Sequence, residues 1–288
     1  MIKRLWIINK DEWKKIRMIG ATISELGRLF EDLKSERFDC VVDLQGLLRS
    51  GIIAKATGAP VRIGFMEARE VATLFYTHTV KAGKELHAVD RYMRIADFLG
   101  CDCDGIVFPF PPEVPFDDLN IPDGYGIIAP GARWDTKRWP SERFGEVASK
   151  LPVRTVVIGG ISDKAIAQEV VRYSKGKAIS VAGETRTREL IHIIKRARFM
   201  LCNDTGPMHI AAALGVPVFA IFGPTDPVKT GPYGNGHTVI RLAVPCSPCR
   251  KRTCDDLKCL RWLQTETVYE IIKEKLDERP SRKETMLC

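Results

Sequence analysis

A polar turn between two apolar runs carries the most evident chemistry of this sequence. It lies in NDTGPMHIAAALGVPVFAIFGPTDP, residues 203–227. Residues 199–202 and 216–222 are short apolar runs typical of buried strands, and residues 211–214 are helix formers. The pattern therefore predicts a strand, a sharp turn, a helix and a second strand.

The turn has the residue types that begin a helix. Asp204 and Thr205 are favoured N-cap residues, and Gly206 permits a tight turn. Pro207 suits the first helical position, and Gly215 ends the helix. Such a helix directs free backbone N–H groups and the positive end of its dipole toward one point, where phosphate binds readily. Many corners of this kind are purely structural connections, and that alternative remains open at this point.

The turn belongs to a longer alternation of strands and helices in the second half of the chain. Strands are expected at residues 125–129, 154–158, 178–181, 199–202 and 216–222. Helices are expected at residues 141–150, 187–197 and 265–276. We expect Ser141 to cap the first of these helices, and Ser162 or Asp163 to cap a further one. Strands joined through helices by short loops imply a parallel sheet covered on both faces.

Three polar loops follow strands of this expected sheet. They are PGARWDTKRWP at residues 130–140, NDTGPMH at residues 203–209 and GPTDP at residues 223–227. Ligands of such sheets bind at the carboxyl ends of the strands, which meet at one edge. Three polar loops at one edge favour a binding site over a purely structural connection.

The first half of the chain also alternates strands and helices. Strands are expected at residues 38–44 and 62–65, and helices at residues 49–57 and 87–99. A proline-rich stretch at residues 109–124 follows and disfavours regular structure. We therefore predict an α/β fold with two Rossmann-like domains, residues 1–112 and residues 122–288, joined by this linker.

The composition is that of a folded protein with excess positive charge. Forty-four Lys and Arg against 36 Asp and Glu give a net charge of +8. This charge favours phosphorylated small molecules, nucleic acid or an anionic membrane surface, or it is a basic surface with no particular partner. The sequence has no basic motif interleaved with aromatic residues, which disfavours nucleic acid. No apolar run approaches the roughly 20 residues that span a bilayer, so a cytoplasmic location is expected.

Several of these segments together resemble one known family. The segment at residues 203–227, PGARWDTKRWPSERF upstream and DLQGLLRSGIIAKATGAPVRIGF near the start resemble the ADP-heptose:lipopolysaccharide heptosyltransferases, inverting glycosyltransferases of the GT-B fold. The resemblance covers residues 39–268. AREVATLFY and HAVDRYM look more like the type I enzymes, which add the first heptose to the Kdo sugar of the lipid A inner core. As in GT-B proteins, the final helix at residues 265–276 is expected to pack across both domains.

The resemblance implies a donor site for ADP-heptose in the second domain, with no further cofactor required. The implied donor-binding residues are Arg133, Glu189, Asp204, Thr205, Gly206, Pro207, Met208 and His209. Asp204 would repel a diphosphate unless its carboxylate is occupied in capping or in hydrogen bonds. Glu189 matches a family acid near the donor ribose but also fits an exposed helix carboxylate. His209 also fits a structural hydrogen-bonding role.

Lys137 resembles the family lysine that contacts the donor phosphate. An ammonium group there would stabilise the negative charge that develops on departing ADP, and loss of such a contact costs about 3–4 kcal/mol of barrier. Arg133 and Arg138 are close in sequence, so the choice among these cations stays open. A solvated surface charge is the alternative interpretation of Lys137.

The acceptor side is implied in the first domain. Gln45, Arg49 and Ser50 follow an expected strand, in a region that relatives use for the acceptor. Arg49 and Arg69 would pair with acceptor carboxylates or phosphates in a bidentate way, or they are ordinary surface arginines. The implied acceptor is membrane-embedded Kdo-lipid A, so we expect transient contact with an anionic membrane surface and a location peripheral to the inner membrane.

The start of the chain differs from the family pattern. Relatives begin with an apolar strand and a Gly-Asp loop whose aspartate is the expected general base, whereas this chain begins MIKRLWIINKDEWKKI. We expect about one βαβ unit to be absent, which would leave the N-terminal domain incomplete with an exposed sheet edge. Asp43 lies on a different strand and is not assigned as the base. The chain is therefore expected to bind ADP or ADP-heptose and to transfer sugar poorly or not at all.

Four cysteines form the run CSPCRKRTCDDLKC. Their spacing is C-x2-C-x4-C-x4-C, and the residues are Cys246, Cys249, Cys254 and Cys259. Four thiolates so close in sequence would suit a structural zinc site or an iron-sulfur cluster, or they are thiols that pack a loop. Two alternatives to an active heptosyltransferase follow: a non-catalytic ADP-sugar-binding protein, and a metal-stabilised nucleic-acid binder.

Overall fold

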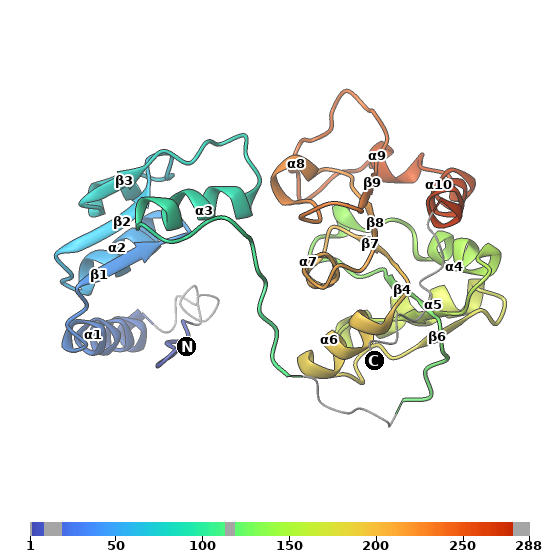
Figure 1. Cartoon of the computed structure of the whole chain (residues 1–288), viewed down its shortest axis with the longest axis horizontal. Helices are drawn as coiled ribbons and strands as arrows, with labels where there is room; N and C mark the ends of the chain where they lie inside the picture. The colour runs from blue at the N-terminus through green and yellow to red at the C-terminus, as the bar shows by residue number, and fades with distance from the viewer. Residues whose placement is uncertain (1, 9–18, 113–118, 279–288) are drawn as a thin grey trace. The chain divides into compact units, whose positions relative to one another are not determined.

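The chain forms two compact units, each built around a parallel sheet. The structure is a computed structural model that describes residues 2–8, 19–112 and 119–278 (Figure 1). The units are Met1–Gly105 and Ile106–Cys288. Every strand pair in the described residues is parallel, which confirms the predicted α/β class.

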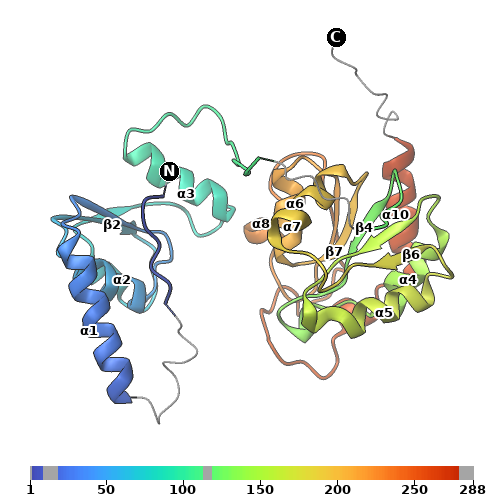
Figure 2. The ribbon, with the colours of Figure 1, turned by 90° about the horizontal axis from the view of Figure 1, so that it is seen from below.

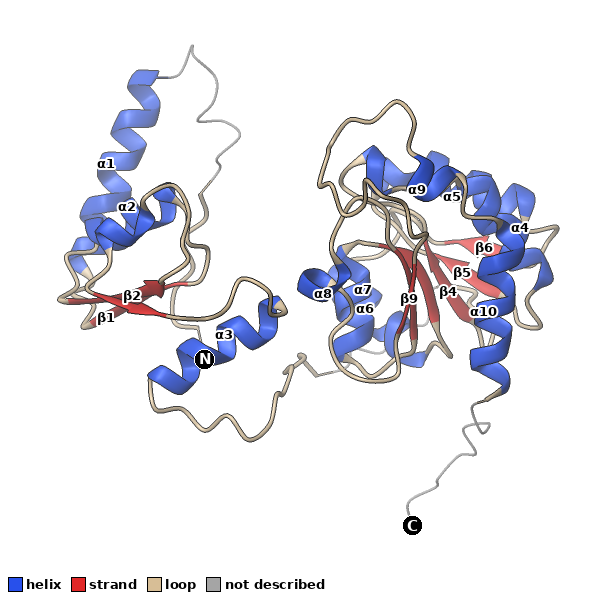
Figure 3. Ribbon diagram, turned by 90° about the horizontal axis from the view of Figure 1, so that it is seen from above, coloured by secondary structure: helices blue, strands red, loops and turns tan. Residues whose placement is uncertain are grey.

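The first unit has a three-stranded sheet in the order β1-β2-β3. Its strands are β1 (Cys40–Asp43), β2 (Val61–Phe65) and β3 (His78–Val80). Its helices are α1 (Ile19–Ser35), α2 (Leu48–Ala56), the 3-10 helix η2 (Ala72–Phe75) and α3 (Ala88–Phe98). Helices α1 and α2 lie on one face of this sheet and α3 on the other (Figures 2 and 3). Among the described strands β1 pairs with β2 alone, so β1 is an edge of this sheet.

The second unit has a six-stranded sheet in the order β6-β5-β4-β7-β8-β9. Its strands are β4 (Gly126–Ala129), β5 (Thr155–Val157), β6 (Ala178–Ser180), β7 (Met200–Asn203), β8 (Val218–Ile221) and β9 (Thr238–Ile240). Its helices are η3 (Asp135–Lys137), α4 (Ser141–Lys150), η4 (Ile161–Asp163), α5 (Lys164–Tyr173), α6 (Thr187–Arg196), α7 (Gly206–Ala213), α8 (Pro227–Thr230), α9 (Lys258–Arg261) and α10 (Thr265–Asp277).

The strand order of the second sheet reverses between β4 and β7. The chain runs outward from β4 through β5 to β6, returns through α6, and then runs outward in the other direction from β7. At such a reversal the connections leave toward opposite faces, which opens a crevice at the carboxyl ends of the two central strands. The turn at residues 203–206 lies at this point.

Both faces of the second sheet are covered. Helices α4, α5 and α10 lie on one face of the sheet and α6 and α7 on the other (Figure 3). Their side chains contribute to two separate apolar cores, one on each face. The crossing of α4 and α5 is close, because a Cβ at Gly145 would lie 2.5 Å from the side chain of Tyr173. Burial on both faces explains why the strands are continuous apolar runs without alternation.

The expected strands and helices of the second half are found within two residues of their predicted ends. The expected cap at Ser141 is wrong: the N-cap of α4 is Pro140, and the Ser141 hydroxyl donates to the Glu169 carboxylate on α5. The short strands β3 and β9 were not predicted. In the second unit α10 packs against α4, with Val268 and Ile272 in the core.

Candidate functional site

A pocket lies at the reversal point of the second sheet. It is formed at the carboxyl ends of β4, β5 and β7, beside the N-termini of α6 and α7. Its lining residues are Ala129, Gly131, Ile158, Gly159, Gly160, Asp163, Thr185, Arg186, Thr187, Leu190, Thr205 and Pro207. It thus combines an apolar floor with hydroxyl, carboxylate and guanidinium groups at the place where α/β sheets bind ligands.

Asp163 is a site residue that we expected only as a helix cap. Its carboxylate accepts a hydrogen bond from the Gly160 backbone N–H at 2.9 Å. A Cβ at Gly131 or at Gly159 would lie 2.8 Å from the Asp163 side chain, so glycine is required for this close approach. Asp163 therefore brings one carboxylate into the pocket. In the sequence, the position of Asp163 shortly after a strand and the Gly159-Gly160 pair indicates a residue near the carboxyl edge of the sheet.

Asn203 joins the two loops on either side of the crevice. This fully buried side chain accepts from the Trp139 backbone N–H at 3.1 Å and donates to the Pro130 carbonyl at 2.7 Å. The loop after β4 and the turn after β7 are thereby fixed to one another. Sequence reasoning placed Asn203 in the turn but gave it no role.

Lys137 and Asp204 form an ion pair at the same place. The Lys137 ammonium lies 2.7 Å from Asp204 Oδ2, and the hydroxyl of Thr225 donates to the same oxygen at 2.7 Å. Asp204 is 7% exposed and Lys137 is 16% exposed at their side chains, so this pair is largely shielded from water. Three polar loops therefore converge on one carboxylate: residues 130–140, 203–209 and 223–227.

The Asp204 carboxylate is occupied, though not as a cap. The N-cap residue of α7 is Thr205, and no side chain caps this helix. Asp204 instead pairs with a cation, which meets the condition for a diphosphate to approach. Burial, together with the charge of Asp204, raises the pKa of the neighbouring Cys202 thiol. An added Cβ at Gly206 would meet no atom within 4 Å, so open space adjoins the start of α7.

The other expected donor residues differ in burial and in whether they line the pocket. Pro207 lines the pocket, whereas the side chain of Met208 is fully buried in the core and can offer only its backbone. His209 and Arg133 are exposed. Glu189 accepts from the Arg186 backbone N–H at 2.6 Å as part of a capping box at the start of α6.

The expected acceptor residues meet at the carboxyl edge of the first sheet. Arg49 donates to the Gln45 side chain at 3.3 Å, and the Arg69 backbone N–H donates to the Gly46 carbonyl at 2.9 Å. Ser50 binds the Leu47 backbone through both its donor and acceptor functions, so its hydroxyl fixes the start of α2. The guanidinium groups of Arg49 and Arg69 are on exposed residues.

The four cysteines of the run are placed in a way that favours loop packing over a metal site. In residues 2–8, 19–112 and 119–278, no three His, Cys, Asp or Glu side chains are grouped to hold a metal ion. The thiol of Cys259 is buried at the start of α9, whereas Cys246 and Cys254 are exposed on irregular chain. Burial, and then the other three thiols, raise the pKa of Cys259.

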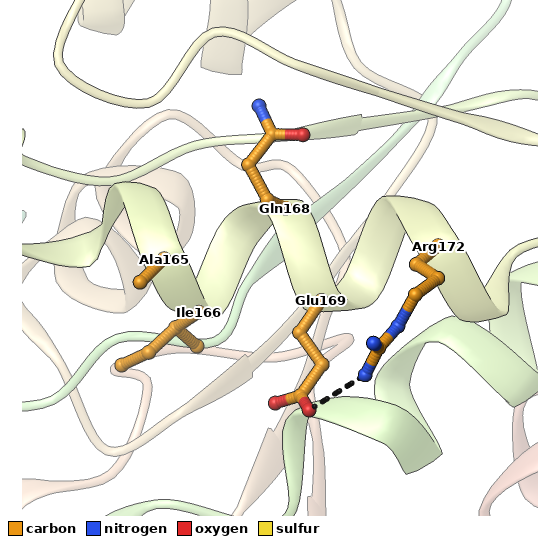
Figure 4. Close-up of a pocket in the computed structure, with 5 residues that line it drawn as sticks. All are labelled: Ala165, Ile166, Gln168, Glu169 and Arg172. Atoms are coloured by element: carbon orange, nitrogen blue, oxygen red, sulfur yellow. Dashed lines mark hydrogen bonds and ion pairs between the residues drawn. The ribbon is translucent and has the colours of Figure 1, made fainter.

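A second hollow lies along α5, and its charged groups are already paired with one another. Its lining residues are Ala165, Ile166, Gln168, Glu169 and Arg172. Figure 4 shows these side chains along one helix, with Glu169 and Arg172 paired at 3.2 Å. An i,i+3 surface pair of this kind is typical of a solvated helix face, and we assign no site there.

The fold defines the class of protein. Two α/β units with parallel sheets match solved GT-B glycosyltransferases. The structure of Escherichia coli heptosyltransferase WaaC with ADP aligns with a TM-score of 0.71 and 24% identity, covering 95% of this chain and 84% of that one. A glycosyltransferase family 9 structure from Veillonella parvula aligns with a TM-score of 0.71 and 25% identity, covering 89% and 79%.

The sequence defines the family. The pattern of glycosyltransferase family 9 (heptosyltransferase) matches residues 26–260, and this chain belongs to that family. Lipopolysaccharide heptosyltransferase 1 of Pseudomonas aeruginosa is 29% identical over 270 residues, which cover 87% of this chain and 71% of that protein. No helix in the part of the chain that the structure describes is long and apolar enough to cross a membrane.

Proposed function

We propose that this chain transfers heptose from ADP-heptose to the Kdo region of the lipid A inner core, with inversion at the anomeric carbon. The observation that carries the proposal is the Lys137–Asp204 pair at 2.7 Å, beside the start of α7 at the reversal of the sheet. An ammonium group and a helix N-terminus at one place form an anion site suited to a diphosphate.

The donor would lie in the second unit. Its nucleoside would occupy the pocket between Leu190 and Asp163, where the carboxylate suits the hydroxyl groups of a ribose. Its diphosphate would reach Thr205 and Lys137. The WaaC structure that shares this fold contains ADP, which supports the choice of nucleotide. No metal is assigned to this step.

The acceptor would lie at the carboxyl edge of the first sheet. Arg49 and Arg69 present exposed guanidinium groups there, which suit the carboxylate of Kdo or a lipid A phosphate. The relatives named for lipopolysaccharide support this acceptor class. Because the acceptor is membrane-embedded, the basic chain would meet an anionic membrane surface during turnover.

The reaction is a single displacement. An acceptor hydroxyl oxygen bonds to the anomeric carbon while the bond from that carbon to the diphosphate oxygen breaks, and ADP leaves with the electron pair. Lys137 would stabilise the negative charge that grows on ADP. The hydroxyl proton passes to a general base, which we do not assign. Asp43 is not chosen, because both oxygens of its buried carboxylate already accept hydrogen bonds.

Transfer of radiolabelled heptose from ADP-heptose to Kdo-lipid A tests the proposal. We expect labelled product of inverted configuration, and loss of product in Lys137→Ala. Binding of ADP without transfer by the intact chain would instead support a non-catalytic ADP-sugar-binding protein. Failure to bind ADP in calorimetric titration would overturn both.

A further inference from the structure

The segment at residues 246–254, which contains three of the four clustered cysteines, lies against the candidate donor site. The Ser247 hydroxyl donates to the Gly223 carbonyl at 2.6 Å. The Arg250 backbone N–H donates to the Pro224 carbonyl at 2.7 Å. These bonds attach the segment to the loop that supplies Thr225 to Asp204. The segment is therefore part of the wall around the ion pair.

The same segment is attached to the loop that carries Lys137. The Thr136 hydroxyl donates to the Lys251 carbonyl at 2.9 Å. The Arg252 guanidinium carbon lies 4.7 Å from the centre of the Trp134 ring, and the Lys137 ammonium lies 4.7 Å from the centre of that same ring. One indole thus contacts both the cation of the donor site and a cation of the neighbouring segment.

We propose that Arg252 is a positioning residue for Lys137, acting through the indole of Trp134. The proposal rests on the proposed function, in which Lys137 binds the outer phosphate of the donor. Arg252 is exposed and does not line the pocket, so its effect on the donor passes through the ring that it covers.

The positioning effect of Arg252 would arise because the interaction between a cation and an aromatic ring is directional. A cation is held over the face of the ring, so a guanidinium on Trp134 restricts the orientation of the indole. The orientation of the indole in turn limits where the Lys137 ammonium can lie while it remains paired with Asp204. Without Arg252, the ring can turn and the ammonium samples positions away from the phosphate.

The affinity ratio of ADP to AMP measures this effect without requiring turnover. AMP lacks the outer phosphate, so its affinity reports the nucleoside pocket and the fold, and the ratio reports Lys137. Calorimetric titration of the full chain with each nucleotide gives the ratio. We expect Lys137→Ala to lower it at least about tenfold, and Arg252→Ala to lower it about three- to tenfold with AMP affinity unchanged.

Two variants distinguish positioning from general attraction of anions. Lys251→Ala removes the adjacent positive charge, whose side chain lies outside this contact, and is expected to leave the ratio within about twofold. Arg252→Lys keeps a cation that can cover the ring and is expected to restore most of the ratio. Equal losses in Lys251→Ala and Arg252→Ala would overturn the proposal.

A double-mutant cycle tests the route through the ring. In a Trp134→Leu background, Arg252→Ala is expected to change the ratio by less than about twofold, because the connecting ring is absent. An undiminished effect in that background would refute positioning through Trp134. If the intact chain binds ADP and Lys137→Ala lowers the ratio while Arg252→Ala does not, only this inference fails. If the intact chain does not bind ADP, the proposed function fails with it.

Discussion

Two buried aspartates lie at the carboxyl ends of strands, one in each unit, and their surroundings differ. Asp43 ends β1, Asp204 follows β7, and each is 6% exposed. Asp43 accepts from the backbone N–H groups of Gln45 and Gly46 and from the Tyr76 hydroxyl at 2.6 Å. The partners of Asp204 are instead a hydroxyl and the Lys137 ammonium.

The difference distinguishes a structural corner at Asp43 from the corner at Asp204, which we propose as a binding corner. Asp43 accepts from two backbone N–H groups of its own turn and from the distant Tyr76 hydroxyl, so its carboxylate fixes the turn through neutral donors. Burial, and then the hydrogen bond to Asp43, raise the pKa of Tyr76, so this hydroxyl stays a donor. At Asp204 the partner is a cation from a separate loop, and we propose that this cation also contacts an anionic ligand. An aspartate at the carboxyl end of a strand thus has a different role according to the group with which it pairs.

Removal of the Lys137 ammonium group is expected to have the largest effect on activity. Lys137→Ala should lower the rate of heptose transfer about 10²–10³-fold, because a charge that stabilises the leaving group is lost. Steady-state kinetics with ADP-heptose measures the change. Lys150→Ala is the matched control, since Lys150 pairs with Glu266 on the surface and should change the rate by less than about twofold. A loss below tenfold in Lys137→Ala would place the catalytic charge elsewhere.

Removal of Asn203 tests how the binding corner is held together. Asn203→Ala leaves the Trp139 N–H and the Pro130 carbonyl without their partner, which should lower the free energy of unfolding of the second unit by about 3 kcal/mol. Denaturant unfolding followed by tryptophan fluorescence measures it, because Trp139 is itself buried there. Asn203→Asp keeps the acceptor but sets a buried carboxylate oxygen against the Pro130 carbonyl, so it should lose at least as much. Equal stability of the intact chain and both variants would show that the two hydrogen bonds of Asn203 do not stabilise the second unit.

Removal of Asp43 tests the structural corner. Asp43→Ala should destabilise the first unit by about 2 kcal/mol, because two backbone N–H groups and a tyrosine hydroxyl lose their acceptor. Amide hydrogen exchange in β1 and β2 measures the change, and Asp43→Asn should show a smaller one. The affinity for ADP should not change in either variant. A loss of ADP affinity would contradict the separation of the two corners.

The smallest expected effect is a pH dependence in the first unit. Burial alone would raise the pKa of Glu67, but hydrogen bonds from the backbone N–H groups of Gly83 and Ala82 and the charge of Arg91 lower it below its ordinary value of 4.5. The ionised carboxylate therefore stabilises the unit above that value, and this contribution is lost as the pH falls through the lowered pKa.

Comparison with Glu67→Gln isolates this contribution. The intact chain should be more stable than the variant near neutral pH, and the difference should shrink on acidification between about pH 5 and pH 3. Amide hydrogen exchange of β2 and β3 across this range measures it. A difference that grows on acidification would show the opposite sign of pKa shift.

The sequence by itself determined the alternation of elements and the place of the polar loops. Continuous apolar runs mark the buried strands, and Gly206, Pro207 and Gly215 mark the limits of α7, because these signals act between neighbours along the chain. It also carried the family motifs, and family membership is confirmed over residues 26–260. Strands of three residues such as β3 and β9 give too little pattern to be predicted.

Only the tertiary structure decided which partner each polar group has. The sequence predicted that Asp204 caps a helix, whereas in the structure Asp204 forms an ion pair with Lys137. Glu189, which the sequence suggested as a donor contact, accepts a capping hydrogen bond from the Arg186 backbone N–H. Among the residues that the structure describes, the fold groups no three of the four clustered cysteines so that they could hold a metal ion, and it places Arg252 on the ring that Lys137 also contacts. Apart from the local cap at Glu189, these partners come from loops far apart in the chain, and the strand order of the sheet sets their distances. Spacing along the sequence carries no information about such distances.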